Sequence, residues 1–183
     1  MAVLKAMYHS FRSGETRSIW NHPSLLAPEL ISMTSTDFAP GGAIPLIHSG
    51  TGVGDNQSPQ LAWTGVPPVA EQLLLIIEDT DAPLPRPIIH TIALLGSAHS
   101  SLPTGGLSSA TASLIFMPAS LRRRGYQGPR PLPGHGPHHY GFNLFALATE
   151  VVRPDRIRNW HQLINTLDGL VLARGRLIGL QER

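Results

Sequence analysis

Two apolar runs in the middle of the chain constrain the fold most. The first, QLLLIIE (72–78), ends at an acidic residue, and the second, IIHTIALL (88–95), contains a single histidine. Both have the length of a strand, and neither alternates between apolar and polar positions. Such continuous runs are typical of strands that are buried on both faces. We therefore predict two neighbouring core strands, joined by a short acidic and proline-rich connection.

Shorter runs and turn-rich segments surround this pair. Further strands are predicted near 31–38, 114–117, 140–150 and 170–180, with brief strands inside the turn-rich segment 41–68 and loops at 96–113 and 118–138. One substantial helix is predicted near 154–168, because apolar residues recur there at helical spacing, and a short one near 24–31. Residues 1–30 show no sustained periodicity and are interpreted as an N-terminal extension before a domain at 31–183.

Composition supports one mostly β domain. Of 183 residues, 42% are hydrophobic and only 14% are charged, while 18 glycines and 17 prolines indicate many turns. The absence of cysteine excludes disulfides and thiolate metal sites. With no apolar run of about 18 residues and no apolar segment near the N-terminus, we expect a cytoplasmic protein without a transmembrane segment.

The basic residues do not indicate a nucleic-acid partner. The formal net charge is only +2, and no aromatic residues are interleaved with the basic ones. Arg122, Arg123 and Arg124 are consecutive, and arginine binds phosphate well. A solvated loop is nevertheless the favoured interpretation of this run.

Acidic residues and a histidine flank the two core strands. Glu78, Asp79 and Asp81 follow one another at the end of the first strand, where three carboxylates repel each other if they are desolvated together. Asp79 is interpreted with equal weight as a turn acceptor or as a site residue. His90 lies within the second strand, so we expect a neutral ring or one paired with a carboxylate.

A second cluster stands where the proline- and glycine-rich loop enters the strand near 140. Alternation along a strand places His138 and Tyr140 on one face and His139 on the other. Together with His90, His135 and Asp79, these histidines could bind zinc, but their spacing matches no helical histidine pair. A metal-free anion pocket without a cofactor is therefore preferred, and no G-x-S-x-G nucleophile elbow is present.

Several motifs together resemble the phosphatidylethanolamine-binding protein family, which includes the Raf kinase inhibitor proteins, in its shorter bacterial-type branch. They are SPQLAWTGVP (58–67), DTDAP (79–83), His90, GPRP (128–131), HHY (138–140) and GLVLARGRLIG (169–179). They occur in the family's order over roughly 31–180.

The resemblance implies a large antiparallel sheet packed on a smaller one, with a C-terminal helix. It also implies a small pocket for phosphate, phosphorylated head groups or other anions. The residues that it places at this pocket are Asp79, Asp81, Pro83, His90, Gly128, Pro129, His138 and Tyr140. Pro83 and the Gly128–Pro129 turn would shape the wall, and the backbone near Gly128 would offer N–H groups to an anion.

The chain departs from the family pattern at four places. Thr91 stands where a tryptophan is common, His139 replaces the arginine of H-R-Y, Leu170 replaces a late histidine, and no aromatic residue follows near Gln181. These changes leave the acidic and histidine residues in place and make the rim smaller and more apolar.

Two functions follow from this resemblance and these residues. The preferred one is a binding protein for a small, anionic or phosphorylated ligand, or a regulatory inhibitor of a kinase or protease, with a homodimer left open. The alternative is a cofactor-independent enzyme, an isomerase or cyclase acting on an apolar metabolite, with Asp79, His90, His138 and Tyr140 as its catalytic residues.

Overall fold

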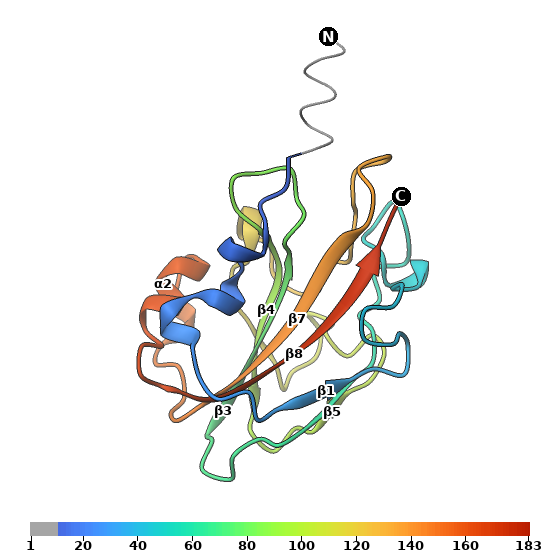
Figure 1. Ribbon diagram of the computed structural model, residues 1–183. Helices are drawn as coiled ribbons and strands as arrows, with labels where there is room; N and C mark the ends of the chain where they lie inside the picture. Colours follow the sequence, from blue (N-terminus) through green and yellow to red (C-terminus); the bar gives the residue numbers. More distant parts are fainter. Residues whose placement is uncertain (1–10) are drawn as a thin grey trace.

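Two antiparallel sheets form the body of the computed structural model, which describes residues 11–183 (Figure 1). The larger sheet has the strand order β6–β4–β3–β7–β8 and the smaller one β1–β2–β5. The strands are β1 Ser32–Thr34, β2 Leu61–Thr64, β3 Gln72–Asp79, β4 Ile88–Gly96, β5 Ser101–Leu102, β6 Ile115–Phe116, β7 His138–Leu147 and β8 Val171–Gln181. The α-helix α2 spans Trp160–Asn165, and short 3-10 helices are η1 Glu15–Arg17, η2 Ile19–Asn21, η3 Pro23–Leu25, η4 Leu46–His48, η5 Ser120–Arg122 and η6 Pro154–Arg156.

The central strand of the larger sheet, β3, is buried along its whole length. Leu73, Leu75 and Ile77 contribute to one hydrophobic core, whereas Leu74 and Ile76 contribute to a second core on the other face. Both faces of residues 73–77 meet apolar partners, which explains why these five positions are all apolar. The prediction of core strands buried on both faces is confirmed for β3.

The smaller sheet covers one face of the larger sheet. Met33 of β1, Leu61 and Trp63 of β2 and Leu102 of β5 are buried in the core that the two sheets share. Each sheet by itself would leave an apolar face in water, so packing face to face is the arrangement that removes both faces from solvent. The predicted fold class, a large antiparallel sheet packed on a smaller one, is confirmed.

The N-terminal segment, residues 11–30, and α2 cover the opposite face of the larger sheet (Figure 1). Ile19 and Leu25 are buried in the same core as Leu163 and Ile164 of α2. These apolar side chains supply the partners that Leu74 and Ile76 of β3 need on this face. The structure therefore has a third layer, half of which comes from residues before the first strand.

The N-terminal segment also satisfies a buried carboxylate. Glu78 of β3 is completely buried on this face, and burial raises its pKa, although hydrogen bonds from the segment oppose the rise. Its carboxylate accepts hydrogen bonds from Ser18 Oγ at 2.5 Å, from Ile19 N at 2.9 Å and from Asn143 Nδ2 at 3.0 Å. Without Ser18 and Ile19, this buried group would lose most of its donors.

The C-terminal helix is shorter than its apolar pattern predicts. Pro154–Arg156 form a 3-10 turn, and the α-helix begins only at Trp160, because Asn159 caps it through a bond from Gln162 N to Asn159 Oδ1 of 2.9 Å. The predicted short helix near 24–31 is limited to the 3-10 turn Pro23–Leu25. Within residues 11–183, every helix is too short or too polar to span a lipid bilayer.

Candidate functional site

The candidate site lies where β3 ends and β7 begins. In the antiparallel register Asp79, the last residue of β3, is paired with Tyr140 of β7, and His138 is the first residue of β7. His138 and Tyr140 are buried, whereas the His139 side chain between them is half exposed. The alternation predicted from the sequence therefore holds, with His138 and Tyr140 on the face of Asp79.

A β-bulge in β4 brings His90 to the same place. Ile77 of β3 pairs with Thr91 and Glu78 pairs with Ile89, so His90 is the extra residue between them. An extra residue lets the strand re-aim a side chain that strict alternation would direct elsewhere. The His90 ring consequently packs edge-on against Tyr140, with 5.5 Å between ring centroids.

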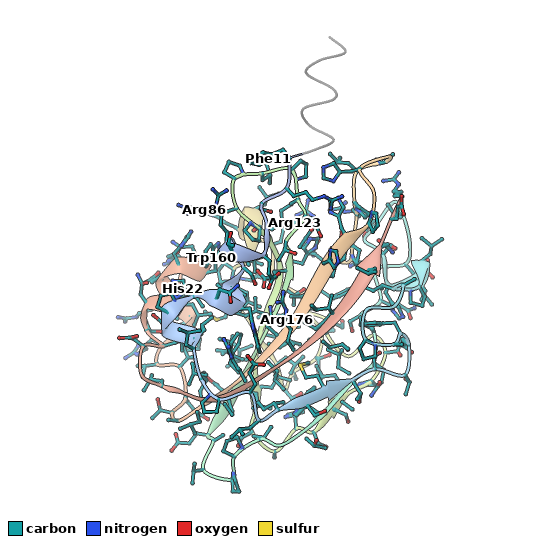
Figure 2. The ribbon with its side chains drawn as sticks, in the orientation of Figure 1. Phe11, His22, Arg86, Arg123, Trp160 and Arg176 are labelled. Atoms are coloured by element: carbon teal, nitrogen blue, oxygen red, sulfur yellow. The ribbon has the colours of Figure 1, made fainter. Side chains whose placement is uncertain are left out.

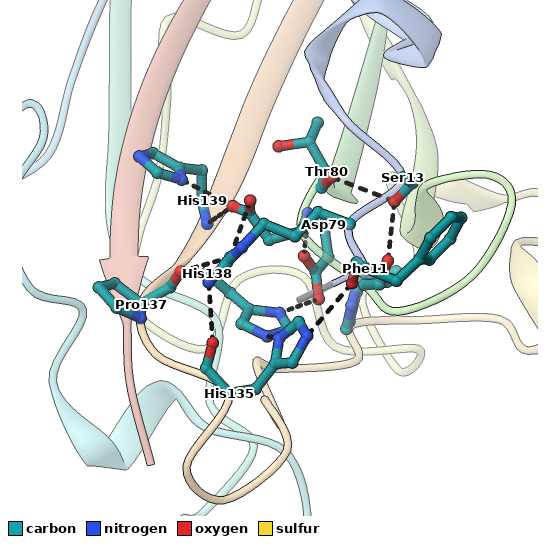
Figure 3. A network of polar contacts seen from close by, with 12 residues as sticks. Phe11, Ser13, Asp79, Thr80, His135, Pro137, His138 and His139 are labelled. Carbon is teal, nitrogen blue, oxygen red and sulfur yellow. Dashed lines mark hydrogen bonds and ion pairs between the residues drawn. The ribbon is translucent and has the colours of Figure 1, made fainter. Parts of the chain in front are cut away.

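A buried chain of hydrogen bonds runs from Asp79 through two histidines (Figure 3). Asp79 Oδ2 lies 2.9 Å from His138 Nδ1, His138 Nε2 lies 2.6 Å from His135 Nδ1, and His135 Nε2 lies 3.2 Å from the carbonyl oxygen of Phe11. The carboxylate and the carbonyl only accept, so a ring N–H donates at each end of this chain of hydrogen bonds. The chain of hydrogen bonds thus joins the end of β3, the start of β7 and the N-terminal segment.

A second carboxylate, Asp81, links the N-terminal segment to this chain of hydrogen bonds. It accepts hydrogen bonds from the backbone and ring of His139 at 2.7 and 2.6 Å, and Arg12 lies 2.9 Å away as an ion pair. Burial tends to raise the pKa of Asp81, but these hydrogen bonds outweigh it and hold the pKa below its ordinary value. Arg12 also donates to the carbonyl oxygens of His135 and Pro137 at 2.8 Å, so the segment seals the histidine side of the site.

A cavity of about 150 Å³ opens on the other side of Asp79. Its wall is formed by Asp79, Ile88, Ile89, His90, Ser120, Leu121, Arg123, Gln127 and Arg130. His90 Nδ1 donates to the carbonyl oxygen of Gln127 at 2.9 Å, while its Nε2 is buried and has no hydrogen-bond partner among residues 11–183. The Tyr140 hydroxyl is likewise buried, close to the carboxylate of Asp79.

Protonation of both groups follows from their burial. Burial lowers the pKa of His90, and the charges of Arg130 and Arg123 act in the same direction, whereas Asp79 opposes them. His90 is therefore a neutral ring near pH 7, with the proton on Nδ1 and a free acceptor at Nε2. Burial and the nearby Asp79 charge raise the pKa of Tyr140, so its hydroxyl remains a donor.

The wall residues expected from the resemblance lie elsewhere. Gly128 N donates to Asn56 Oδ1 at 2.9 Å, and a Cβ at Gly128 would meet His48 O at 2.1 Å, so this glycine allows close packing against the 46–57 loop. Pro129 accepts from Gly50 N at 2.9 Å in the same contact. Pro83 follows Ala82, whose carbonyl oxygen is held by Ser13, and it is not part of the cavity wall. The Gly128 N–H is thus already used, and an anion would have to find other donors.

Sequence reasoning missed four contributors. Arg123 and Arg130 line the cavity, although the arginine run was interpreted as a solvated loop, and His135 is buried rather than on an open loop. Arg12 lies in the segment that was set aside as an extension. The three consecutive arginines were the available signal for Arg123; no pattern marked Arg12. Among residues 11–183, no group of three or more His, Asp or Glu side chains is arranged to hold a metal ion.

Comparison with known proteins agrees with the fold. The family model described as phosphatidylethanolamine-binding protein matches residues 34–182. A UPF0098 protein of Pyrococcus abyssi is 32% identical over 160 residues, which cover 85% of this chain and 86% of that protein. Phomoidride biosynthesis cluster protein B of a fungal species is 31% identical over 131 residues, 66% of this chain and 62% of that protein. The crystal structure of the homologue CT736 of Chlamydia trachomatis has a TM-score of 0.73 at 28% identity and covers 85% of this chain and 99% of its own.

Proposed function

The chain belongs to the phosphatidylethanolamine-binding protein family, and from that premise we propose that it binds a small anion in the cavity beside Asp79 and His90. The ligand is a phosphate, a sulfate or a phosphorylated head group. His90, Arg123 and Arg130, which line the cavity, are its ligand-binding residues. Asp79, His138 and Asp81 hold the site together from behind.

The unpartnered Nε2 of His90 carries this proposal. A buried polar atom without a partner is rare in a folded protein and is normally satisfied by water or a ligand. His90 lines a cavity whose wall also contains two arginines, the side chains that bind phosphate and sulfate most readily. The volume of about 150 Å³ is below the roughly 300–1,000 Å³ of sites for drug-sized ligands, so it suits a head group alone.

Asp79 does not oppose an anion at this site. Its Oδ2 accepts a hydrogen bond from His138 Nδ1 at 2.9 Å, and its Oδ1 accepts one from Asp81 N at 2.8 Å, so both oxygens already have donors. An anion that arrives beside neutral His90 favours protonation of that ring at Nε2. Binding is therefore coupled to uptake of one proton, and affinity increases as the pH falls.

Calorimetric titration with sulfate tests this proposal, because the charge of sulfate is constant over the relevant pH range. We expect sulfate affinity to rise by up to about tenfold for each unit of decrease in pH below 8. His90→Gln should weaken binding by about 10- to 100-fold and remove the pH dependence, since it deletes a charge-assisted hydrogen bond. Arg158→Ala, an exposed arginine outside the cavity, is the matched control and should have no effect. Unchanged binding in His90→Gln would exclude this cavity as the site.

A second candidate function is cofactor-independent acid–base catalysis. Neutral His90 is a competent base at Nε2, the Tyr140 hydroxyl is a donor for a developing oxyanion, and one relative is named after a biosynthesis cluster. Such an enzyme would isomerise or cyclise an apolar metabolite. Metabolite profiles of a strain carrying His90→Gln should then lose one product and accumulate its precursor. Identical profiles would leave binding as the function.

Inhibition of a kinase or protease, a homodimer and a cytoplasmic location remain hypotheses that come from the resemblance and composition. The proposed anion site, which lies within the described residues, does not require a second binding surface.

A further inference from the structure

An apolar groove adjoins the anion cavity. It has a volume of about 610 Å³ and is lined by Leu84, Pro85, Arg86, Pro87, Ile88, Ala119, Ser120, Leu121, Arg122, Asn159, Trp160 and His161. Ile88, Ser120 and Leu121 also line the cavity, so the two spaces share one wall. Figure 2 shows Arg86, Trp160 and Arg123 on the side of the molecule where the N-terminal segment and α2 lie. A ligand can therefore occupy both spaces at once.

The shared wall contains an unusual turn. Leu121 and the next residue, Arg122, both have a φ of 57°, a left-handed conformation that non-glycine residues rarely adopt. The Leu121 side chain is 85% exposed, and Leu84 across the groove is 46% exposed. Strained backbone and exposed apolar side chains cost stability, and where both border a cavity they indicate a binding role. This turn holds an apolar side chain at the boundary between cavity and groove.

Charge at the groove favours the same kind of ligand as charge in the cavity. Arg86 and Arg122 lie in the groove wall, which contains no Asp or Glu. Arg86 Nη1 lies 3.4 Å from His161 Nε2, so its charge is not neutralised by a carboxylate there. The groove thus offers apolar surface under a positive potential, which favours an anion that carries hydrocarbon.

We propose that the natural ligand is an anionic molecule with a single aliphatic chain, whose head enters the cavity at His90 and whose chain lies in the groove between Leu84 and Trp160. This inference rests on the proposed function and specifies its ligand. In this proposal the aliphatic chain is held by the groove, so the ligand is bound as a free molecule and not within a membrane.

A series of alkyl sulfates of increasing length tests this ligand class. Methyl, butyl, hexyl and octyl sulfate, each below its critical micelle concentration, are titrated calorimetrically into the full chain at pH 6.5. Burial of each added methylene in the groove should raise affinity by about two- to fourfold until the groove is filled. Equal affinity for methyl and octyl sulfate would overturn the inference and leave anion binding intact. No binding of sulfate or of any alkyl sulfate would instead refute the proposed function.

Two matched variants test where the aliphatic chain of the ligand lies. Leu84→Asn should lower octyl sulfate affinity about tenfold and leave methyl sulfate affinity unchanged, because the residue touches only the groove. Val69→Asn is the control: Val69 is 72% exposed and precedes β3, at the end of the strand opposite Asp79. Chain-length dependence that survives in Leu84→Asn would place the hydrocarbon elsewhere and contradict the inference. The inference would also be contradicted if the protein floated together with phosphatidylethanolamine vesicles but did not bind octyl sulfate.

Discussion

His138 is the residue on which the polar chain behind the cavity depends. It is 1% exposed, and both of its ring nitrogens are engaged, by Asp79 and by His135. Removing it leaves Asp79 as a buried carboxylate with one partner fewer, and breaking a buried ion pair in this way is strongly destabilising. We therefore expect His138 to contribute to the stability of the fold through these two contacts.

We expect His138→Ala to lower the free energy of unfolding by about 2–4 kcal/mol. Urea denaturation at pH 7 measures this loss. His99→Ala is the control, because His99 is only partly buried and its ring bonds only to the nearby Gly96 carbonyl oxygen. A His138→Ala protein as stable as the control variant would show that the chain from Asp79 to Phe11 contributes nothing to the fold.

At this scale the sequence predicted the positions of some site residues and not of others. Strand alternation was sufficient to place His138 and Tyr140 on the face of Asp79. It could not place His90, because a bulge in β4 depends on how two strands pair and not on either strand alone. Nor could it show that Gly128 N–H bonds to Asn56, a contact between segments 72 residues apart.

Among the elements, the N-terminal segment has the largest effect on the site. Arg12 connects Asp81 of the β3 end with the carbonyl oxygens of His135 and Pro137 in the loop before β7. Ser13 Oγ donates to the carbonyl oxygens of Thr80 and Ala82 at 3.1 Å. One short segment thus joins the two strand ends that carry Asp79 and His138 (Figure 3).

The Asp81 contacts predict a pH dependence of stability. The pKa of Asp81 is lower in the folded protein than in the unfolded chain, so the unfolded chain binds more protons in acid. Its contribution to stability is present above its ordinary pKa of about 4 and is lost as the pH falls through the lower folded value. Unfolding free energies measured between pH 6 and 3 should therefore fall less steeply in Asp81→Asn than in the unmodified protein.

The matched pair for this measurement is Arg12→Ala and Arg17→Ala, since Arg17 bonds only to the exposed Pro85 carbonyl oxygen. Arg12→Ala should resemble Asp81→Asn in part, and Arg17→Ala should follow the unmodified curve. If the unfolding free energies of all four proteins depended on pH in the same way, the contact between Asp81 and Arg12 would not contribute to the pH dependence of stability.

Across the whole molecule, three layers are needed to bury β3 on both faces. Periodicity predicted β3, β4, β7 and β8 well, since long apolar or alternating runs determine them. It did not reveal that residues 11–30 form part of the third layer, because 3-10 turns have no sustained apolar period. Helix α2 was predicted too long for a related reason, as the Asn159 cap overrides the apolar pattern that begins at Ile157.

The third layer gives a prediction for the whole fold. A chain that begins at Ile31 lacks Ile19 and Leu25 from the core and the Ser18 and Ile19 donors of Glu78. We expect this shorter chain to unfold at a temperature at least 10 °C lower than the full chain, because burial of these side chains contributes several kcal/mol of stability. If it does not fold at all, it should bind a hydrophobic dye even at low temperature. Thermal unfolding followed by circular dichroism measures the difference. An unchanged transition would show that the domain is complete from residue 31.

The central claim is that His90 Nε2, an acceptor without a hydrogen-bond partner among residues 11–183, takes up a proton from solvent when an anion binds beside it. Nitrogen NMR of the His90 ring tests this claim most directly. In ¹⁵N-histidine-labelled protein at pH 7 without ligand, the account predicts a protonated Nδ1 and an unprotonated Nε2, and saturation with sulfate should move the Nε2 signal to the protonated range. An Nε2 that is already protonated without ligand, or a signal that does not move at saturation, would contradict the account.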